Sequence, residues 1–152
     1  MRVFIGGVMQ GSKRDKAVNN QDYRRTIAQQ VKAQHPESEI VDPWAMFPGS
    51  MNYDANRARQ VLFDMAHEAA KADIVIAYLP QASMGTALEM VRAYDAGTPV
   101  ISISPMAENW FIRSLSRRVF PSLASFCAWV ETGELARIKG EGTEAHSATL
   151  RA

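Results

Sequence analysis

Runs of apolar residues alternate with amphipathic segments along most of the chain. The strand-like runs are almost wholly apolar, as expected for strands that are covered on both faces. Apolar residues three and four positions apart predict helices between these runs. The predicted strands cover residues 2–6, 39–41, 73–79 and part of 97–104. The predicted helices cover 20–34, 55–71, a segment that ends near 96, 110–117 and 123–137.

This alternation predicts a single doubly wound α/β domain of the Rossmann or flavodoxin-like type. We expect a mainly parallel sheet of four to five strands, flanked by helices, within residues 1–138. Residues 139–152 lack apolar periodicity and are expected to form a flexible C-terminal tail. Ligands of such sheets bind outside the carboxyl ends of the strands, so the site is expected in loops 6–16, 42–54 and 80–84.

The composition is that of a globular protein and argues against several classes of function. The 152 residues contain 17 Lys and Arg against 16 Asp and Glu, a balance that favours neither nucleic acid nor an anionic membrane as partner. No stretch approaches the roughly 20 apolar residues of a membrane span. The first apolar run is too short for a signal peptide, and the single cysteine, Cys127, fits a reducing compartment. We therefore expect a cytoplasmic protein.

A glycine-rich loop, GGVMQGSKRDK, follows the first predicted strand. It approaches the phosphate-binding pattern G-x-x-x-x-G-K-[S/T], but Ser12 precedes Lys13, and this order excludes a nucleoside triphosphatase. Two interpretations stay open: a simple turn, or a loop whose backbone N–H groups approach a phosphate or hydroxyl group. The scattered histidines show no metal-ligand spacing, and no serine elbow is present. The sequence thus indicates no cofactor.

The segment YLPQASMGTALEM, residues 78–90, places Glu89 in the first turn of a predicted helix. Thr86 and Glu89 fit a capping box, in which each side chain satisfies a backbone donor. The same position suits a nucleophile, because a helix N-terminus favours an ionised carboxylate. Gly85 lets a substrate approach the backbone, and Ser83 offers a hydroxyl group. The pattern alone leaves both roles of Glu89 open.

Residues 72–101, ADIVIAYLPQASMGTALEMVRAYDAGTPVI, resemble the signature of the nucleoside 2-deoxyribosyltransferase superfamily. This superfamily includes deoxynucleoside 5'-monophosphate N-glycosidases and CMP N-glycosidases. The shared features are a strand beginning Ala-Asp, a Gly-Thr pair, a glutamate in the first helical turn and the sequence G-x-P-V-I. The glycine loop and NWFIR at 109–113 extend the resemblance over residues 2–115.

The resemblance implies that Glu89 attacks the anomeric carbon of a nucleoside or nucleoside 5'-monophosphate. A covalent glycosyl-enzyme would form, and water or another nucleobase would resolve it. Asp64 would position the sugar and the nucleophile, although it lies one residue farther from Asp73 than the family's aspartate. Ser83 matches a phosphate-binding serine of the hydrolases, whereas Asn109 matches an asparagine that the transferases lend to a neighbouring subunit. Hydrolysis and base transfer both stay open.

The resemblance also implies a wider set of substrate-binding residues and an assembly. These residues are Gly6, Gly7, Met9, Gln10, Trp44, Ser83, Gly85, Thr86 and Asn109. Met9 and Gln10 stand where the hydrolases carry a phosphate-binding arginine, and Lys13 or Arg14 of the same loop is the alternative cation for that role. In the second loop, Trp44, with Phe47, Met51 and Tyr53, would stack on the base or simply cover the sheet. The family's assembly implies a homodimer or a larger homo-oligomer.

Two other functions stay open. The shifted Asp64 and the missing loop arginine also fit a non-catalytic nucleotide-binding or sensor module on the same fold. Such a module would bind its ligand without releasing a base. A third, weaker interpretation is glutamate-dependent cleavage of an NAD-like dinucleotide. All three interpretations share a small-molecule nucleoside or nucleotide as the partner.

Overall fold

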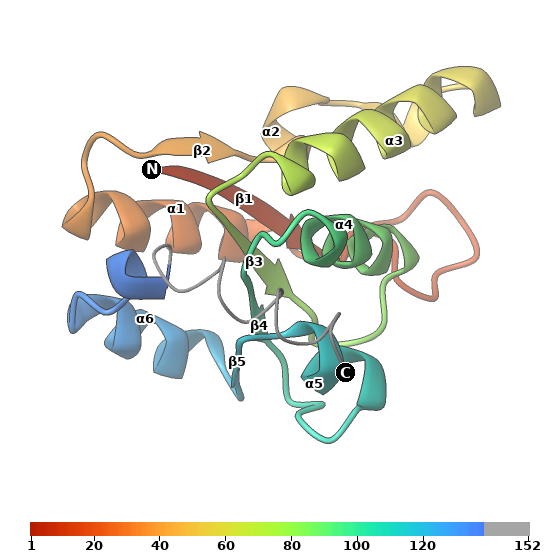
Figure 1. Ribbon diagram of the computed structural model, residues 1–152. Helices are drawn as coiled ribbons and strands as arrows, with labels where there is room; N and C mark the ends of the chain where they lie inside the picture. The colour runs from red at the N-terminus through yellow and green to blue at the C-terminus, as the bar shows by residue number, and fades with distance from the viewer. Residues whose placement is uncertain (139–152) are drawn as a thin grey trace.

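The computed structural model describes residues 1–138, and the tail expected over 139–152 lies outside the described residues. A five-stranded sheet forms its centre, with all strands parallel and in the order β2-β1-β3-β4-β5 (Figure 1). The strands are β1 (Arg2–Gly7), β2 (Glu39–Val41), β3 (Ile74–Tyr78), β4 (Val100–Ile103) and β5 (Arg118–Phe120). The helices are α1 (Asp22–Gln34), α2 (Pro43–Met46), the 3-10 helix η1 (Ser50–Asn52), α3 (Ala55–Ala70), α4 (Met84–Asp95), α5 (Trp110–Leu115) and α6 (Leu123–Glu131). The predicted α/β class and parallel sheet are confirmed.

Helices cover both faces of the sheet, which explains the apolar character of its central strands. Helices α1 and α6 pack on one face, and α3, α4 and α5 pack on the other (Figure 1). Successive side chains of a strand point to opposite faces. Ile5 and Ile76 therefore join Phe126 in the core beneath α1 and α6, whereas Phe4 and Met90 lie in the core beneath α3 and α4.

The edge strand β5 is the strand that the hydrophobic pattern did not locate, and the short helices α2 and η1 lie in a segment that was expected to be a loop. It has three residues, begins with the exposed Arg118 and pairs only with β4. A short strand at the edge of a sheet needs no continuous apolar run, so its sequence resembles a loop. The preceding and following helices are correspondingly shorter than predicted, ending at Leu115 and Glu131.

The strand order reverses between β1 and β3, because the chain goes from β1 to β2 on one side and continues from β3 to β4 on the other. Loops that leave two such strands in opposite directions open a crevice at their carboxyl ends. Gly6 and Gly7 end β1 and pair with Ala77 and Tyr78 of β3. The glycine loop and the N-terminal part of α4 therefore meet at this edge of the sheet.

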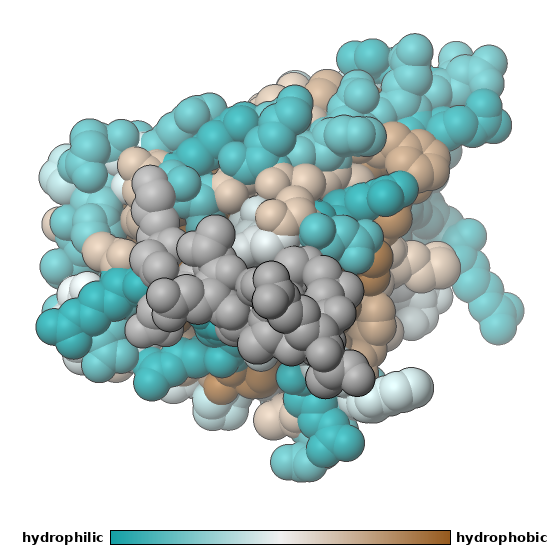
Figure 2. Space-filling view, in the orientation of Figure 1, coloured by the Kyte–Doolittle hydropathy of each residue, from teal (hydrophilic) through white to brown (hydrophobic). Residues whose placement is uncertain are grey.

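Hydrophilic side chains cover much of the face seen in Figure 2, and apolar atoms show in the region between α3 and α4. Exposed apolar residues include Leu62 and Phe63 of α3 and Met84 at the start of α4. Within residues 1–138, no helix combines the length and hydropathy that a membrane span requires. The apolar region thus lies beside the crevice at the end of β1 and β3.

Candidate active site

A hollow of about 390 Å³, called here the Glu89 hollow, opens at the carboxyl ends of β1 and β3. Most of its wall is apolar and comes from the glycine loop, the segment before α3, α3 itself and the start of α4. Its apolar side chains are Met9, Pro43, Phe47, Met51, Ala58, Val61, Leu62, Met65 and Met84, with Tyr53 beside them. Among the described residues that line it, Glu89 is the only acidic or basic one.

Glu89 is buried, with 9% of its surface exposed. Its Oε2 atom is inaccessible to solvent and has no hydrogen-bond partner among residues 1–138. Burial raises the pKa of Glu89 to about 8, although the nearby Arg24 guanidinium lowers it in part. A buried carboxyl that no protein group satisfies is costly, so its presence in a hollow points to a role with a ligand.

The structure corrects the predicted start of the helix that carries Glu89. Helix α4 begins at Met84, and Ser83 is its N-cap, with Oγ accepting from the backbone N–H of Thr86 at 3.4 Å. Glu89 therefore lies in the second turn, and the predicted capping box of Thr86 and Glu89 is wrong. The helix dipole acts mainly within the first turn, so it does not offset the effect of burial on this pKa.

Several residues predicted from the sequence do gather around Glu89. Those that share its hollow are Gly7, Met9, Gln10, Ser83, Gly85 and Thr86. Gly6 lies directly against the carboxyl group, because a side chain at this position would collide with Oε2 of Glu89. The glycine loop therefore brings backbone, and not side chains, close to the carboxyl group at the end of β1.

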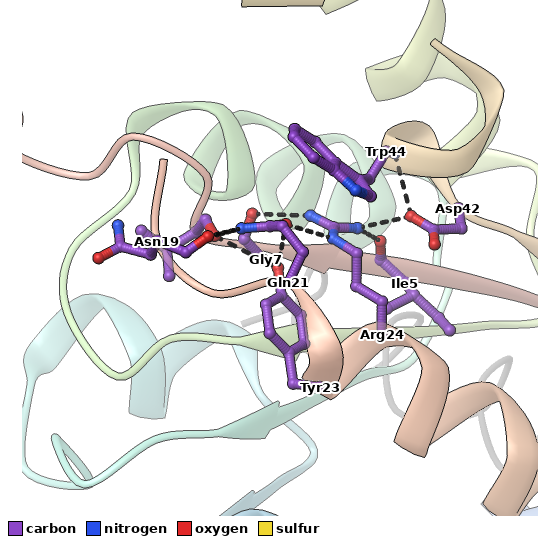
Figure 3. A network of polar contacts seen from close by, with 9 residues as sticks. Ile5, Gly7, Asn19, Gln21, Tyr23, Arg24, Asp42 and Trp44 are labelled. Atoms are coloured by element: carbon purple, nitrogen blue, oxygen red, sulfur yellow. Dashed lines mark hydrogen bonds and ion pairs between the residues drawn. The ribbon is translucent and has the colours of Figure 1, made fainter. Parts of the chain in front are cut away.

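A buried cation, Arg24, lies behind the glycine loop (Figure 3). Its guanidinium donates to Asp42 Oδ1 at 2.8 Å and forms an ion pair with it. It also donates to three oxygens near the end of β1: Ile5 O at 2.8 Å, Gly7 O at 3.1 Å and Gln21 Oε1 at 2.8 Å. Arg24 thus ties the end of β1 to the end of β2 and places a positive charge near Glu89.

Neither Arg24 nor its neighbour Tyr23 was predicted from the sequence as a site residue. Burial raises the pKa of Tyr23, whose hydroxyl donates to Val8 O at 3.3 Å and whose ring stacks on Tyr78 at 4.1 Å. A signal was present, because Arg24 lies seven residues before Val31 and so shares the inward face of α1. A charged residue on the buried face of a helix indicates a satisfied internal ion pair or a site.

Trp44 does not line the Glu89 hollow. It lies beside the Arg24 guanidinium, and its backbone N–H donates to Asp42 Oδ1 at 3.0 Å (Figure 3). The short helix α2, capped by Asp42, carries the indole away from Glu89. The residues of this loop that do line the Glu89 hollow are Phe47, Met51 and Tyr53.

Asp64 also lies outside the Glu89 hollow. It is exposed on α3 and lines a separate surface depression with His67, Glu68 and Lys71. One extra residue in the spacing rotates a side chain by about 100° on a regular helix, which accounts for this placement. The role expected of Asp64 therefore finds no support in the geometry.

Asn109 caps α5, with Oδ1 accepting from the N–H groups of Phe111 at 3.0 Å and Ile112 at 3.2 Å. Within one chain it lines a neighbouring hollow and not the one that holds Glu89. Ser83 borders both hollows, and its Oγ lies 3.1 Å from Thr86 Oγ1.

In the part of the chain that the structure describes, no three His, Cys, Asp or Glu side chains gather as metal ligands do.

No family model matches the sequence, and no curated protein matches it. Solved structures, by contrast, do match the structure of this chain. A 2-deoxyribosyltransferase from Bacillus psychrosaccharolyticus has a TM-score of 0.61 and 16% identity, over 83% of this chain and 90% of that chain. A conserved protein from Enterococcus faecalis V583 has a TM-score of 0.59 and 14% identity, over 87% of this chain and 98% of that chain.

A third structure, a CMP N-glycosidase from Clostridium botulinum, has a TM-score of 0.51 and 14% identity, over 87% of this chain and 98% of that chain. At these identities the likeness shows a common fold. The resemblance inferred from residues 72–101 is confirmed at that level. The chain therefore has the fold that a 2-deoxyribosyltransferase and a CMP N-glycosidase share.

Proposed function

We propose that the protein cleaves the N-glycosidic bond of a nucleoside or nucleoside 5'-monophosphate, with Glu89 as the nucleophile. One observation carries this proposal: a buried carboxyl group lines a hollow at the strand-order reversal, and no group within residues 1–138 satisfies its Oε2 atom. The common fold with two enzymes named for nucleoside chemistry supports it. In the proposed reaction the hollow brings the substrate to this carboxyl group, which acts in its ionised form.

In the proposed reaction, the Glu89 carboxylate attacks the anomeric carbon, and the bond between this carbon and the base nitrogen breaks. The bonding electrons leave with the base, and a glycosyl ester forms on Glu89. Water or a second base then attacks the same carbon and releases the carboxylate. The apolar wall of the hollow suits a nucleobase, and the rings of Phe47 and Tyr53 offer stacking surfaces for it.

The proposal includes a second copy of the chain. Trp110 is 79% exposed and Phe111 is 39% exposed, directly after Asn109 at the start of α5. Exposed aromatic residues of this kind suit contact with another subunit. A homodimer would place Asn109 near a neighbour's site. Light scattering on the purified protein tests this, and a monomer at assay concentration would contradict it.

A non-catalytic nucleotide-binding module is the second candidate function. The observation that favours it is the position of Asp64, which leaves Glu89 as the only acidic residue lining its hollow among those described. Such a module would show ligand-dependent thermal stabilisation, but no base release on prolonged incubation.

Chromatographic detection of free base tests the two candidates. The substrates are ribonucleosides, deoxyribonucleosides and their 5'-monophosphates, each with and without an acceptor base. Wild type is compared with Glu89→Gln and with Glu37→Gln, a matched change at an exposed turn. We expect base release from wild type and Glu37→Gln alone. Release by a folded Glu89→Gln protein would exclude the nucleophile, and thermal stabilisation without any release would favour the binding module.

A further inference from the structure

A second hollow, of about 400 Å³, adjoins the Glu89 hollow, and the two share Gly11, Ser83 and Met84 as lining residues. It lies at the carboxyl end of β3, between the start of α4 and the start of α5. Its remaining wall is mainly apolar and consists of Leu79, Ala82, Ala87, Met106, Phe111 and Ile112, with Ser12 and Asn109 at its polar positions. The two hollows therefore adjoin, with Ser83 on their border, and the pair is called the depression here.

Charge distinguishes this depression from a phosphate site. Among the described residues that line either hollow, none is Lys, Arg or His, and the one carboxylic acid is Glu89. A phosphate monoester carries nearly two negative charges at neutral pH, and its sites usually supply arginine or lysine. Arg24 is buried and already donates to protein oxygens, among them Asp42 Oδ1 and Ile5 O. Arg57 lies over the rings of Phe47 and Tyr53, and Lys16 donates to Asn52 Oδ1, so these two cations lie on the side of the Glu89 hollow and line neither hollow.

The shape of the depression suits a substrate with an apolar group at each end of its sugar. Ser83, whose Oγ contacts Thr86, borders both hollows, and a sugar with its anomeric carbon at Glu89 would extend past this border. Met84 is 88% exposed and borders both hollows. Its flexible, polarisable side chain can pack against an apolar group in either one.

We propose that the second hollow receives the 5' substituent of the substrate, and that this substituent is uncharged and apolar, as in a 5'-alkylthio-5'-deoxynucleoside. The proposal rests on the proposed function, which places the anomeric carbon of the substrate next to Glu89. It selects one substrate class from those the reaction admits, and it rejects the 5'-monophosphate. The preference follows from the apolar wall and from the lack of a cation among the described residues that line it.

The test is calorimetric binding to Glu89→Gln, which retains the depression and blocks turnover, with three ligands of the same base and sugar. Their 5' groups are hydroxyl, methylthio and phosphate. We expect the methylthio nucleoside to bind roughly tenfold tighter than the nucleoside, as one extra apolar group in a pocket typically gives. We expect the phosphate to bind no tighter than the nucleoside. Tightest binding of the 5'-monophosphate would overturn the inference.

A pair of variants at Ala82, an exposed residue of the second hollow, controls for charge. Ala82→Lys should improve binding of the 5'-monophosphate and weaken the methylthio preference, whereas the neutral Ala82→Met should retain that preference. Unchanged phosphate binding in Ala82→Lys would place the 5' group elsewhere and overturn the inference. Base release by wild type is measured in parallel. If the methylthio preference is present and no base is released, the substrate class stands and the proposed reaction fails.

Discussion

A Cβ atom on Gly6 would lie 2.6 Å from Oε2 of Glu89, a separation that real Cβ atoms essentially never show. The next nearest atoms, Thr86 Cγ2 at 3.4 Å and Phe4 Cε1 at 3.6 Å, would stay at acceptable distances. The lack of a side chain at the end of β1 therefore allows the carboxyl group of α4 to approach the edge of the sheet. Gly6 and Glu89 should behave as an energetically coupled pair.

The first prediction concerns this coupling. Gly6→Ala should lower the free energy of unfolding by about 1–3 kcal/mol, the usual cost of overpacking. In a Glu89→Ala background the same change should cost much less, because the colliding carboxyl group is gone. Urea unfolding of the four proteins gives the coupling as a double-mutant cycle. Equal costs in the two backgrounds would show that Gly6 is required for another reason.

The second prediction concerns the pH dependence of stability. Burial raises the pKa of Glu89 from 4.5 to about 8, so between these values the folded state retains a proton that the unfolded state has lost. The contribution of Glu89 to stability is therefore favourable at low pH and is lost as the pH rises toward 8. Glu89→Gln should be increasingly more stable than wild type from pH 5 to pH 8. A difference that does not vary with pH would contradict the raised pKa.

The third prediction concerns the pH dependence of turnover. Attack on the anomeric carbon requires the carboxylate form of Glu89, which burial disfavours below about pH 8. The value of kcat/KM should therefore rise about tenfold per pH unit below pH 8 and level off above it. Initial rates of base release over this range check the profile. A rate that falls across the same range would assign Glu89 the role of an acid instead.

The fourth prediction concerns the buried ion pair of Arg24 and Asp42. Arg24→Met should lower the free energy of unfolding by about 3–5 kcal/mol, because it leaves Asp42 as a partly buried, unpaired charge. Arg24→Met with Asp42→Asn should recover part of this loss, since the second change removes that charge. Denaturant midpoints of the three proteins measure both steps. A double variant less stable than Arg24→Met would show that the carboxylate cap of Asp42 on α2 contributes more to stability than removal of its unpaired charge recovers.

Sequence reasoning was sufficient for the central strands, because burial on both faces makes β1, β3 and β4 continuously apolar. It failed at β5, where a short edge strand has no such constraint. It also placed the start of α4 too late. The predicted capping box placed the helix cap at Thr86, whereas the cap is Ser83 and Thr86 lies within the first turn. Because the helix begins three residues earlier than predicted, Glu89 is a buried acid in the second turn and not a capping group in the first.

For the site, the motif residues near Glu89 were predicted correctly as neighbours, because their positions follow directly from two adjacent strand ends. Trp44 and Asp64 were wrongly predicted to lie near Glu89. The direction of Trp44 depends on the short helix α2, and that of Asp64 depends on its rotational position around α3. Arg24 was missed because its role depends on carbonyl groups that only the folded sheet brings together. The position of a residue relative to a strand end thus predicted its contacts. The directions of side chains that tertiary packing orients could not be predicted in this way.

Mass spectrometry of the quenched enzyme tests the central claim most directly. Wild type is mixed with a nucleoside that releases base in the panel, denatured in acid within the first turnovers, and digested. We predict a peptide containing Glu89 that is heavier by the mass of the sugar residue, and no such peptide from Glu89→Gln. Base release by wild type with the sugar absent from Glu89, or present on another side chain, would contradict the account.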